Sequence, residues 1–532
     1  MRLTVYDGAG TIGGNKILVE SNGTSFSFDF GISYSIWSSY FEEYLKPRAA
    51  RGILDPFTVG MLPPIDGIYR EDYFPSSIDM KANFEAHPEF RKLELNGVLL
   101  SHAHLDHSGH ISFLKENIPV YCSPLTAAIS KAVQDTSQGD FEKEVCYKIP
   151  KEENEDGFLK STNFKKVPAV GRPFHLVNPG AVGDRLQNFW NTSAAGRELV
   201  ARPLGEKSDI NGLAIRRYTV DHSIFGSSAF AVETKEGWIV YTGDMRLSGK
   251  KGHLTKSFAE EVRKLNPVLL ITEGTRIYGE DDAIDVGYND LINEDNVFQN
   301  CLNAVKNAKG LVIADFGPRN LERLLTFLDI AKHTGRKLAV MSKDAYILEQ
   351  VHAAIPNEVA DPLFEETIVL FRDVKSSQAG WEKNLLERYG HKMLDGRAVR
   401  KSQKDYIVCM SFLDINELID INPDEGSVYI YSSSEAYSEE QKIDFKRLLN
   451  WLRLFNVKPI GVPDPSCDFK VRDDEKGYHV SGHMMASDLL SIIRTINPKI
   501  VVPVHTEHPG FFKKKLEEFQ VFVPERGKLL EF

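Results

Sequence analysis

The stretch SHAHLDHSGH, at residues 101–110, places four side chains that can bind a metal within six residues: His102, His104, Asp106 and His107. An apolar run before it predicts a buried strand, and the apolar residues after it predict a helix. We therefore expect a loop between a strand and a helix, where a rigid scaffold commonly presents functional residues. Imidazole and carboxylate ligands together suit zinc or a similar divalent ion, and their crowding indicates two ions.

The composition is that of a globular protein with more than one domain. The chain has 532 residues, which exceeds the usual length of a single domain. Apolar residues make up 42% and charged residues 26%, both ordinary values. No apolar run reaches the ~18 residues of a membrane span, so we expect no membrane association. The N-terminus enters a predicted strand directly and lacks the apolar core of a signal peptide.

The cysteines and the net charge bear on compartment and partner. Five cysteines are scattered without a CxxC pair, which favours a reducing cytoplasm and argues against a cysteine metal site. The net charge of −11 argues against a generally basic nucleic-acid surface, although it leaves a local basic groove open.

The patterning of the chain changes along its length. Residues 1–31 alternate like paired strands, and a strand pattern resumes at residue 213. From 285 to 432, apolar strands alternate with helical segments, which predicts a separate open parallel sheet. Two weakly periodic regions, near 32–92 and 135–210, are expected to be insertions that pack over the scaffold, and their purpose stays open.

A second pattern recurs beyond the opening stretch: predicted strands end in side chains that can bind metals. His222, Asp244, Glu273 and His505 each follow an apolar run. Strand ends along one edge of a sheet lie near one another, so these groups can converge. One such residue alone would more often be structural, but the set together predicts a single site.

These residues resemble the motifs of a known protein family. The HAHLDH segment at residues 102–107 resembles the HxHxDH signature of the metallo-β-lactamase fold, and Asp29, His222 and Asp244 stand where that family has its other motifs. The late motifs HVSGH at 479–483 and PVHTE at 503–507 are similar to those of the β-CASP subfamily.

Within that subfamily the chain looks most like ribonuclease J. It ends 27 residues after His505, which resembles the shorter archaeal enzymes that lack the C-terminal domain. Ser342 and Lys343 stand where the family has an Arg-Ser pair, so its 5′-phosphate pocket is not carried over.

The resemblance implies an α/β fold: a metallo-β-lactamase αββα sandwich with an inserted β-CASP α/β domain. Residues 1–284, with the two insertions, would form the first part of the metallo-β-lactamase domain. Residues 285–432 would form the β-CASP domain, facing the metal cleft as a lid, and 433–532 would complete the first domain.

The resemblance also implies a ligand set for two zinc ions, with Mn²⁺ or Mg²⁺ as alternatives. The residues that would hold the first ion are His102, His104, His222 and Asp244. The residues that would hold the second are Asp106, His107, His505 and the bridging Asp244.

Further residues are assigned roles by the same resemblance. Asp29 and Glu273 would orient the ligating imidazoles, and with Asp106 and His483 they make up the expected catalytic set. His483 would contact the scissile phosphate or protonate the leaving oxygen. Ser481 and Gly482 are expected to open a helix beside it, where backbone N–H groups favour an anion.

The function implied is a zinc-dependent ribonuclease that cleaves RNA with a hydroxide activated by two metals, as a 5′-to-3′ exonuclease, an endonuclease or both. One alternative is a DNA nuclease of the same superfamily, against which His505 argues because that branch tends to have valine there. Others are a small-molecule metallo-hydrolase and a catalytically silent RNA-binding subunit. The expected partner is single-stranded RNA, and a homodimer stays open.

Overall fold

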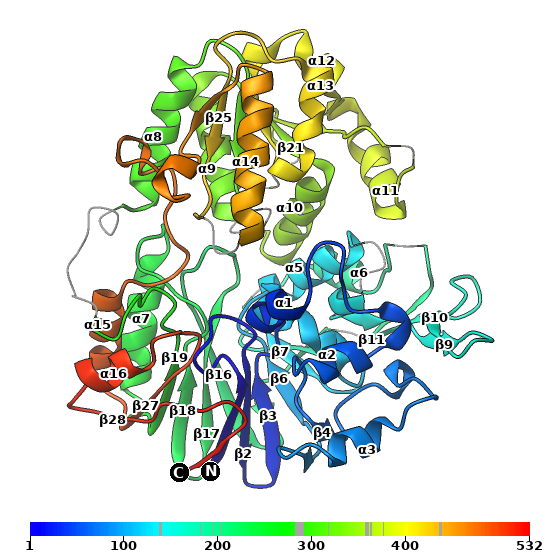
Figure 1. The fold of residues 1–532 in the computed structure, drawn as a ribbon, viewed down its shortest axis with the longest axis vertical. Helices are drawn as coiled ribbons and strands as arrows, with labels where there is room; N and C mark the ends of the chain where they lie inside the picture. The colour runs from blue at the N-terminus through cyan, green and yellow to red at the C-terminus, as the bar shows by residue number, and fades with distance from the viewer. Residues whose placement is uncertain are drawn as a thin grey trace.

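The computed structural model describes residues 1–532 except 138–140, 181, 195, 203, 282–291, 318, 357–360, 362–363, 376 and 436–438. The expected boundary between residues 284 and 285 lies outside the described residues. Figure 1 shows two lobes, one above the other, with both termini at the bottom of the lower lobe. The N-terminal amino group donates to the carbonyl of Phe532 at 3.0 Å.

The lower lobe contains two large sheets. The first has eight strands, in the order β14 (Leu204–Glu206), β12 (Phe174–Leu176), β7 (Val120–Cys122), β6 (Gly97–Leu99), β3 (Thr24–Phe28), β2 (Lys16–Ser21), β1 (Arg2–Asp7) and β29 (Leu529–Glu531). The second has seven, in the order β15 (Asp209–Ile210), β16 (Leu213–Thr219), β17 (Ser228–Thr234), β18 (Gly237–Tyr241), β19 (Leu269–Thr272), β27 (Ile500–Pro503) and β28 (Gln520–Val521).

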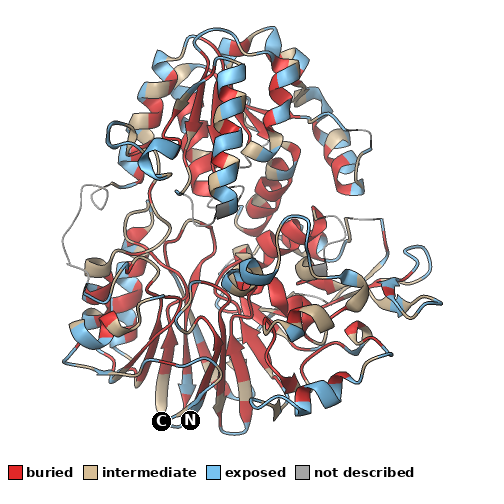
Figure 2. Ribbon diagram, in the orientation of Figure 1, coloured by how far each residue is buried: buried red, intermediate tan, exposed pale blue. Residues whose placement is uncertain are grey.

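The two sheets pack face to face around an apolar core. Phe28 from the first sheet lies with its ring centroid 5.0 Å from that of Tyr241 in the second. Leu3, Ile17 and Phe230 belong to the same fully buried cluster. Figure 2 shows these strands almost entirely buried. Alternation of apolar residues, with one face inward, is what brings two such sheets together.

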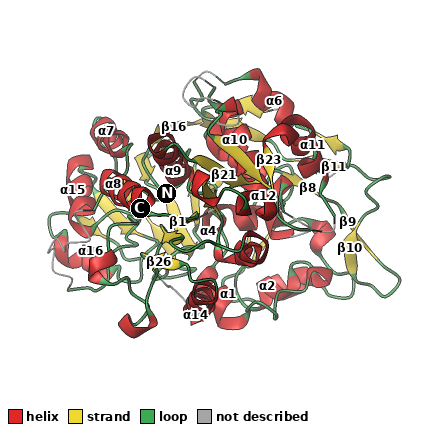
Figure 3. Cartoon of the chain, turned by 90° about the horizontal axis from the view of Figure 1, so that it is seen from above, coloured by secondary structure: helices red, strands yellow, loops and turns green. Residues whose placement is uncertain are grey.

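Helices cover the outer faces of both sheets. The helices α7 (Gly252–Arg263), α15 (Ala486–Ile496) and α16 (Gly510–Lys515) pack on the second sheet through a cluster that includes Phe258, Leu489 and Phe512. Figure 3 shows these helices at one side of the molecule and the elements of the insertions at the opposite side. The order helix, sheet, sheet, helix confirms the predicted αββα sandwich.

The first insertion covers the first sheet. Its elements are α1 (Tyr34–Tyr40), α2 (Leu54–Thr58), β4 (Ile65–Asp66), α3 (Met80–Glu85) and β5 (Arg91–Lys92). Ile53, Tyr73 and Phe84 are buried there against residues of β6 and β7. This region packs over the scaffold as expected.

The second insertion does more than cover the scaffold. After α5 (Pro124–Asp135), its elements are β8 (Tyr147–Lys148), β9 (Lys151–Glu153), β10 (Leu159–Ser161), β11 (Ala169–Gly171), α6 (Asp184–Trp190) and β13 (Leu199–Val200), besides β12 and β14. Because β12 pairs in parallel with β7, and β14 with β12, the region extends the first sheet.

The upper lobe is built around a third sheet in which every pairing is parallel. Its order is β23 (Met393–Leu394), β22 (Ile368–Phe371), β21 (Lys337–Met341), β24 (Tyr406–Cys409), β20 (Val312–Asp315), β25 (Val428–Tyr431) and β26 (Lys458–Ile460). Its helices are α8 (Glu294–Asn307), α9 (Leu321–Thr334), α10 (Ser342–Ala354), α11 (Gly380–Tyr389), α12 (Gly396–Arg400), α13 (Leu418–Ile421) and α14 (Glu439–Leu454). This is the predicted inserted α/β sheet, and α14 and β26 continue it past residue 432. Among the described residues, no helix is both long and apolar enough to cross a membrane.

Candidate metal centre

The loop that carries His102 and His104 is fixed by its flanking elements. Strand β6 pairs in parallel with β3 on one side and β7 on the other. The helix α4 (Leu105–Ser108) begins directly after His104, and the Ser108 hydroxyl donates to the His104 carbonyl at 2.8 Å. The predicted connection from strand to helix is therefore confirmed.

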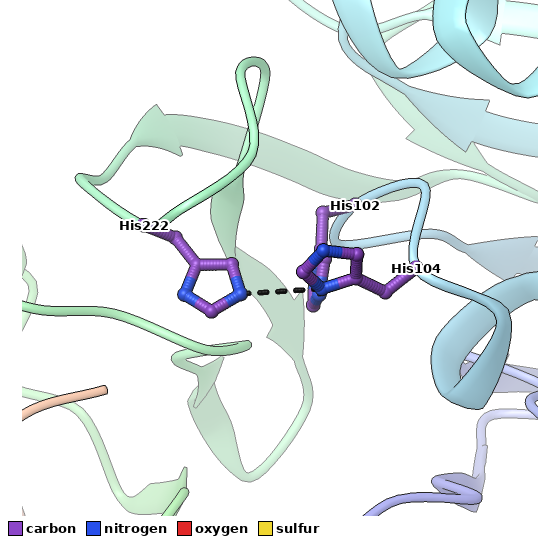
Figure 4. A group of neighbouring side chains, drawn as sticks. All are labelled: His102, His104 and His222. Atoms are coloured by element: carbon purple, nitrogen blue, oxygen red, sulfur yellow. Dashed lines mark hydrogen bonds between the residues drawn. The ribbon is translucent and has the colours of Figure 1, made fainter. Parts of the chain in front are cut away.

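Three imidazoles converge at this loop. His102 Nε2 lies 3.0 Å from His104 Nδ1, and His222 Nε2 lies 3.3 Å from the same nitrogen. Figure 4 shows the first two rings on one loop, with His222 reaching toward them from a separate loop. The candidate ligand atoms of all three lie within 4.8 Å of one another. The group has the size and donor types of a zinc site.

A second group adjoins the first. Asp106, His107 and His505 also offer ligand atoms within 4.8 Å of one another. Asp244 lies between the groups: its Oδ2 is 3.2 Å from His107 Nε2, 3.8 Å from His505 Nε2 and 3.7 Å from His102 Nε2. One carboxylate oxygen within reach of both groups is the arrangement expected of a ligand that bridges two metals.

Hydrogen bonds fix the tautomer of two of these histidines. Asp29, as a carboxylate, only accepts, so the 2.7 Å contact to His107 Nδ1 requires the proton on Nδ1. The Ser101 hydroxyl donates to Asp29 at 2.8 Å and must therefore accept from His102 Nδ1 at 2.9 Å. In both rings the Nε2 lone pair is left facing the centre, which is the form that binds metals.

Hydrogen bonds also fix the tautomers of His222 and His505. His222 Nδ1 donates to the backbone carbonyl of Gly482. The Thr275 hydroxyl donates to Glu273 at 2.7 Å, so it accepts from His505 Nδ1 at 2.8 Å. His222 and His505 thus also present Nε2 to the centre. Glu273 is thus linked to His505 through Thr275, and its role in orienting a ligand stays a prediction.

The electrostatics of the centre favour a bound cation. Burial lowers the pKa of His102 and His104 well below the usual range, which keeps both imidazoles neutral. Burial also lowers the pKa of His107, but Asp244, Asp106 and Asp29 outweigh it and raise that pKa well above its usual value. The same three carboxylates concentrate negative charge at the centre, which favours a bound cation.

Some polar atoms of the centre lack partners. Within the described part of the chain, His107 Nε2, His505 Nε2 and Asp244 Oδ1 are buried without a hydrogen bond. Each such atom costs about 1–3 kcal/mol. Divalent metals bound to these atoms would remove the cost, so the residues present fit metal binding, and imidazole with carboxylate fits zinc.

His483 lies at the edge of the centre. Its Nδ1 is 3.0 Å from Glu273 Oε2 and 3.8 Å from Asp244 Oδ2. Burial lowers the pKa of His483, but Glu273 and Asp244 outweigh it and raise that pKa to about 9. The ring is therefore a proton donor at neutral pH.

The expectation that Ser481 and Gly482 open a helix is wrong. The helix α15 begins at Ala486, so residues 481–483 form a loop before it. The backbone N–H of His483 donates to the Ser481 hydroxyl at 3.1 Å, and the Ser481 carbonyl accepts from Arg246 at 3.3 Å. A helix N-terminus does not supply the anion contact expected there.

Sequence reasoning missed the residues that hold the ligands. Tyr241 donates to Asp29 at 2.7 Å and accepts from Asn15 at 2.9 Å. Tyr241 directly precedes the Thr-Gly-Asp run, and Thr275 follows Glu273 by two residues, so proximity to a motif was the available signal. His110, though near the motif, is buried against Phe113 and belongs to neither group.

Comparisons with known proteins agree with this geometry. A family model described as the Zn-dependent metallo-hydrolase RNA specificity domain matches residues 470–524. Ribonuclease J of Pyrococcus abyssi is 22% identical over 78% of this chain and 75% of its own length. Ribonuclease J of Helicobacter pylori is 19% identical over 99% of this chain, and ribonuclease J2 of Bacillus subtilis is 22% identical over 72%.

The chain spans 59% of the Helicobacter protein and 63% of the Bacillus protein. A crystal structure of a protein of unknown function from Enterococcus faecalis superposes with a TM-score of 0.66 at 21% identity, over 99% of each chain. That likeness concerns the fold alone.

Proposed function

We propose that this chain, a ribonuclease J-like protein with the metallo-β-lactamase and β-CASP fold, is a zinc-dependent ribonuclease that hydrolyses RNA phosphodiester bonds. The observation that carries the proposal is the position of Asp244 Oδ2 between two groups of ligands, 3.2 Å from His107 and 3.7 Å from His102. A paired site of this kind suits a phosphodiester, whose transition state gains negative charge.

The site would hold two metals. The residues proposed for the first are His102, His104, His222 and Asp244, and those for the second are Asp106, His107, His505 and Asp244. Zinc, or Mn²⁺ or Mg²⁺ in its place, would supply Lewis acidity and make water a nucleophile at neutral pH. The fixed Nε2 lone pairs of four histidines support this assignment.

The chain's own residues would move the protons. Asp106, 3.5 Å from His505 and partly exposed, would accept the proton of the attacking water. As the P–O bond breaks, His483 would give a proton from Nε2 to the leaving oxygen, while Glu273 holds the Nδ1 proton. Because Ser481 and Gly482 are engaged with Arg246 and His222, His483 is the favoured phosphate contact of the three.

The upper lobe, which we propose as the β-CASP domain, would cover the substrate. Its Tyr346 donates to Asp135 of the lower lobe at 3.1 Å, and Phe189 of the second insertion lies 6.2 Å from the same ring. Single-stranded RNA would pass between the lobes, and admission of long RNA requires a lid to move or a channel to exist.

The proposal includes a reducing compartment, the cytoplasm, since the five cysteines are free and four of them are buried. A homodimer remains part of the proposal without a surface assigned to it. The competing nucleases and hydrolases of other substrates are disfavoured, because the matched domain is described by its RNA specificity.

One experiment tests the function. The protein, loaded with zinc, is incubated with RNA labelled at the 5′ or the 3′ end and with the same oligomer as DNA, and His104→Ala serves as the inactive control. We expect RNA cleavage that chelation abolishes and zinc restores. The size of the first labelled product separates trimming from internal cutting. Faster DNA cleavage, or zinc-loaded protein without RNA cleavage, would contradict the proposal.

A further inference from the structure

Residues 477–483, which we call the His483 loop, join the two lobes. The chain returns from the upper lobe to the lower lobe here, between β26 and α15, as Figure 1 shows. Val480 is buried in the cluster that includes Leu324 of the upper lobe, whereas Met484, next to His483, is buried in the cluster beneath α15. The loop is therefore anchored in both lobes, and His483 lies at its lower end.

The upper lobe holds the first half of the His483 loop by hydrogen bonds to its carbonyls. Asn300 of α8 donates through its side-chain amide to the Gly477 carbonyl at 2.9 Å. Arg323 of α9 donates to the Tyr478 carbonyl at 3.1 Å, and the hydroxyl of Ser432, which follows β25, donates to the same oxygen. Because these donors come from three elements of the upper lobe, the loop cannot shift against that lobe without breaking several bonds.

Arg246 extends this attachment to His483. Its guanidinium donates to Glu294 of α8 at 3.1 Å and to Glu322 of α9, so two carboxylates of the upper lobe set its direction. The same guanidinium donates to the Ser481 carbonyl at 3.3 Å, and the Ser481 hydroxyl accepts from the backbone N–H of His483 at 3.1 Å. The position of His483 therefore depends on contacts that begin in the upper lobe.

We propose that Arg246, Arg323 and Asn300 are positioning residues, which hold the His483 loop so that His483 reaches the leaving oxygen of the substrate. The inference rests on the proposed ribonuclease function. It adds that the docking of the upper lobe, besides covering the substrate, sets the geometry in which the leaving oxygen receives its proton. Such geometry matters, because misplacing a catalytic group by ~1 Å can lower the rate about 100-fold.

The test uses two substrates that differ in their need for a proton. The ribose oxygen that leaves RNA is strongly basic and needs one, whereas the p-nitrophenolate that leaves bis(p-nitrophenyl) phosphate is a weak base and does not. The kcat of zinc-loaded Arg246→Met on RNA should fall by about 100-fold with KM unchanged, and its kcat on the diester should equal that of wild type. The readout is the ratio of the two kcat values, RNA to diester. His483→Ala should show the same pattern with a loss of about 10²–10⁴-fold.

A second variant keeps the test decisive if Arg246→Met, which removes a buried cation, does not fold. Asn300→Leu removes the bond to the Gly477 carbonyl at a half-buried position, and the ratio should fall about 2- to 10-fold, as expected for one hydrogen bond. Arg336→Met is the matched control, because Arg336 donates to backbone carbonyls of the upper lobe outside the His483 loop. Its ratio should equal that of wild type.

Three results for folded Arg246→Met would overturn the proposal: an equal loss on both substrates, a rise in KM for RNA with kcat unchanged, or a wild-type ratio. If that variant does not fold, a wild-type ratio in Asn300→Leu overturns the proposal alone. Wild type that cleaves the diester but no RNA would instead defeat the ribonuclease proposal itself.

Discussion

Two buried polar clusters lie close together in this molecule and differ in the residues that pair with their carboxylates. The metal-centre cluster consists of His102, His104, Asp106, His107, His222, Asp244 and His505. The junction network, which joins the lobes, consists of Asp221, Arg246, Glu294, Glu322 and Arg323. The side chains of Arg246 and Arg323 are fully buried, as is that of His107.

The junction network pairs its charges internally. Arg323 donates to both oxygens of Glu294, at 3.0 and 2.8 Å. Arg246 donates to Glu294 at 3.1 Å and also to Glu322. Because Glu294 opens α8 and Glu322 lies in α9, these pairs tie the upper lobe to the loop of Asp244. The two arginines are therefore paired with carboxylates of the chain itself, although within the described residues Asp221 Oδ2 and the Nε atoms of both arginines are buried without a hydrogen bond.

The metal-centre cluster has the opposite character. Its imidazoles are held so that lone pairs, not protons, face one another and a shared carboxylate. Among the ion pairs of the described residues, Asp106 and Asp244 are paired with histidines and not with arginine or lysine. Two clusters of similar burial therefore differ in the partners of their carboxylates, which are arginines in the junction network and histidines in the proposed metal centre.

The largest expected effect comes from His104→Ala. The substitution removes the nitrogen that lies 3.0 Å from His102 and 3.3 Å from His222. Hydrolysis of RNA should fall by about 10⁴-fold or more, as when one member of a catalytic unit is removed. The fold should survive, because the ring lies on a loop. Elemental analysis and RNA hydrolysis measure the effect.

His110→Ala is the matched control for that change. This histidine is fully buried, and neither of its ring nitrogens has a hydrogen-bond partner among the described residues, yet it lies outside the cluster. It should lower the free energy of unfolding by about 2–5 kcal/mol through the cavity left behind. Zinc should be retained. Loss of zinc in His110→Ala but not in His104→Ala would reverse our assignment.

The next effect concerns the junction network. Arg323→Met removes two of the hydrogen bonds to buried Glu294 and leaves Arg246 as its remaining charged partner; breaking a buried pair in this way costs about 3–5 kcal/mol. Denaturant unfolding should show this loss, while the folded protein keeps its zinc. Arg336→Met is the control, because Arg336 donates only to backbone carbonyls of the upper lobe. Zinc loss in folded Arg323→Met would show that the two clusters are not separable.

Removal of the metals should destabilise the protein by a smaller amount. A ligand at 100 to 1,000 times its Kd stabilises the folded state by about 3–4 kcal/mol. Dialysis against a chelator should lower the free energy of unfolding by that amount, and zinc should restore it. Faster hydrogen exchange should be confined to the segments that carry the proposed ligands, at residues 101–108, 221–224, 243–246 and 504–506. An equal increase in hydrogen exchange throughout the upper lobe would contradict the distinction between the metal-centre cluster and the junction network.

The sequence predicted the candidate ligands better than it predicted the residues that hydrogen-bond to them. His102, His222, Asp244 and His505 were found because each ends an apolar strand, a pattern that is local in the chain. The bond from Tyr241 to Asp29 joins residues 212 positions apart, and the only signal for it in the sequence is that Tyr241 directly precedes the motif of Asp244.

The fold shows the same division. The third sheet was predicted from the alternation of apolar strands and helical segments, and the sandwich from the resemblance to the metallo-β-lactamase fold, whereas β12 and β14 were read as part of an insertion. These strands have three residues each, and their place in the first sheet is set by pairing with β7. Likewise α15 begins at Ala486 because the preceding residues are held by tertiary contacts with Arg246 and His222.

The smallest expected effect concerns Thr275, which holds the ring of His505 in place. Thr275→Val replaces the hydroxyl by a methyl of similar size and removes its bonds to Glu273 and to His505 Nδ1. His505 then loses the partner that fixes its tautomer, so we expect zinc affinity or kcat to fall by about 10- to 100-fold. Thr275→Ser should restore both. Thr326→Val, whose hydroxyl donates only to the Glu322 carbonyl at 3.0 Å, is the control and should leave zinc affinity unchanged. If Thr275→Val binds zinc and cleaves RNA as wild type does, His505 is oriented by packing alone.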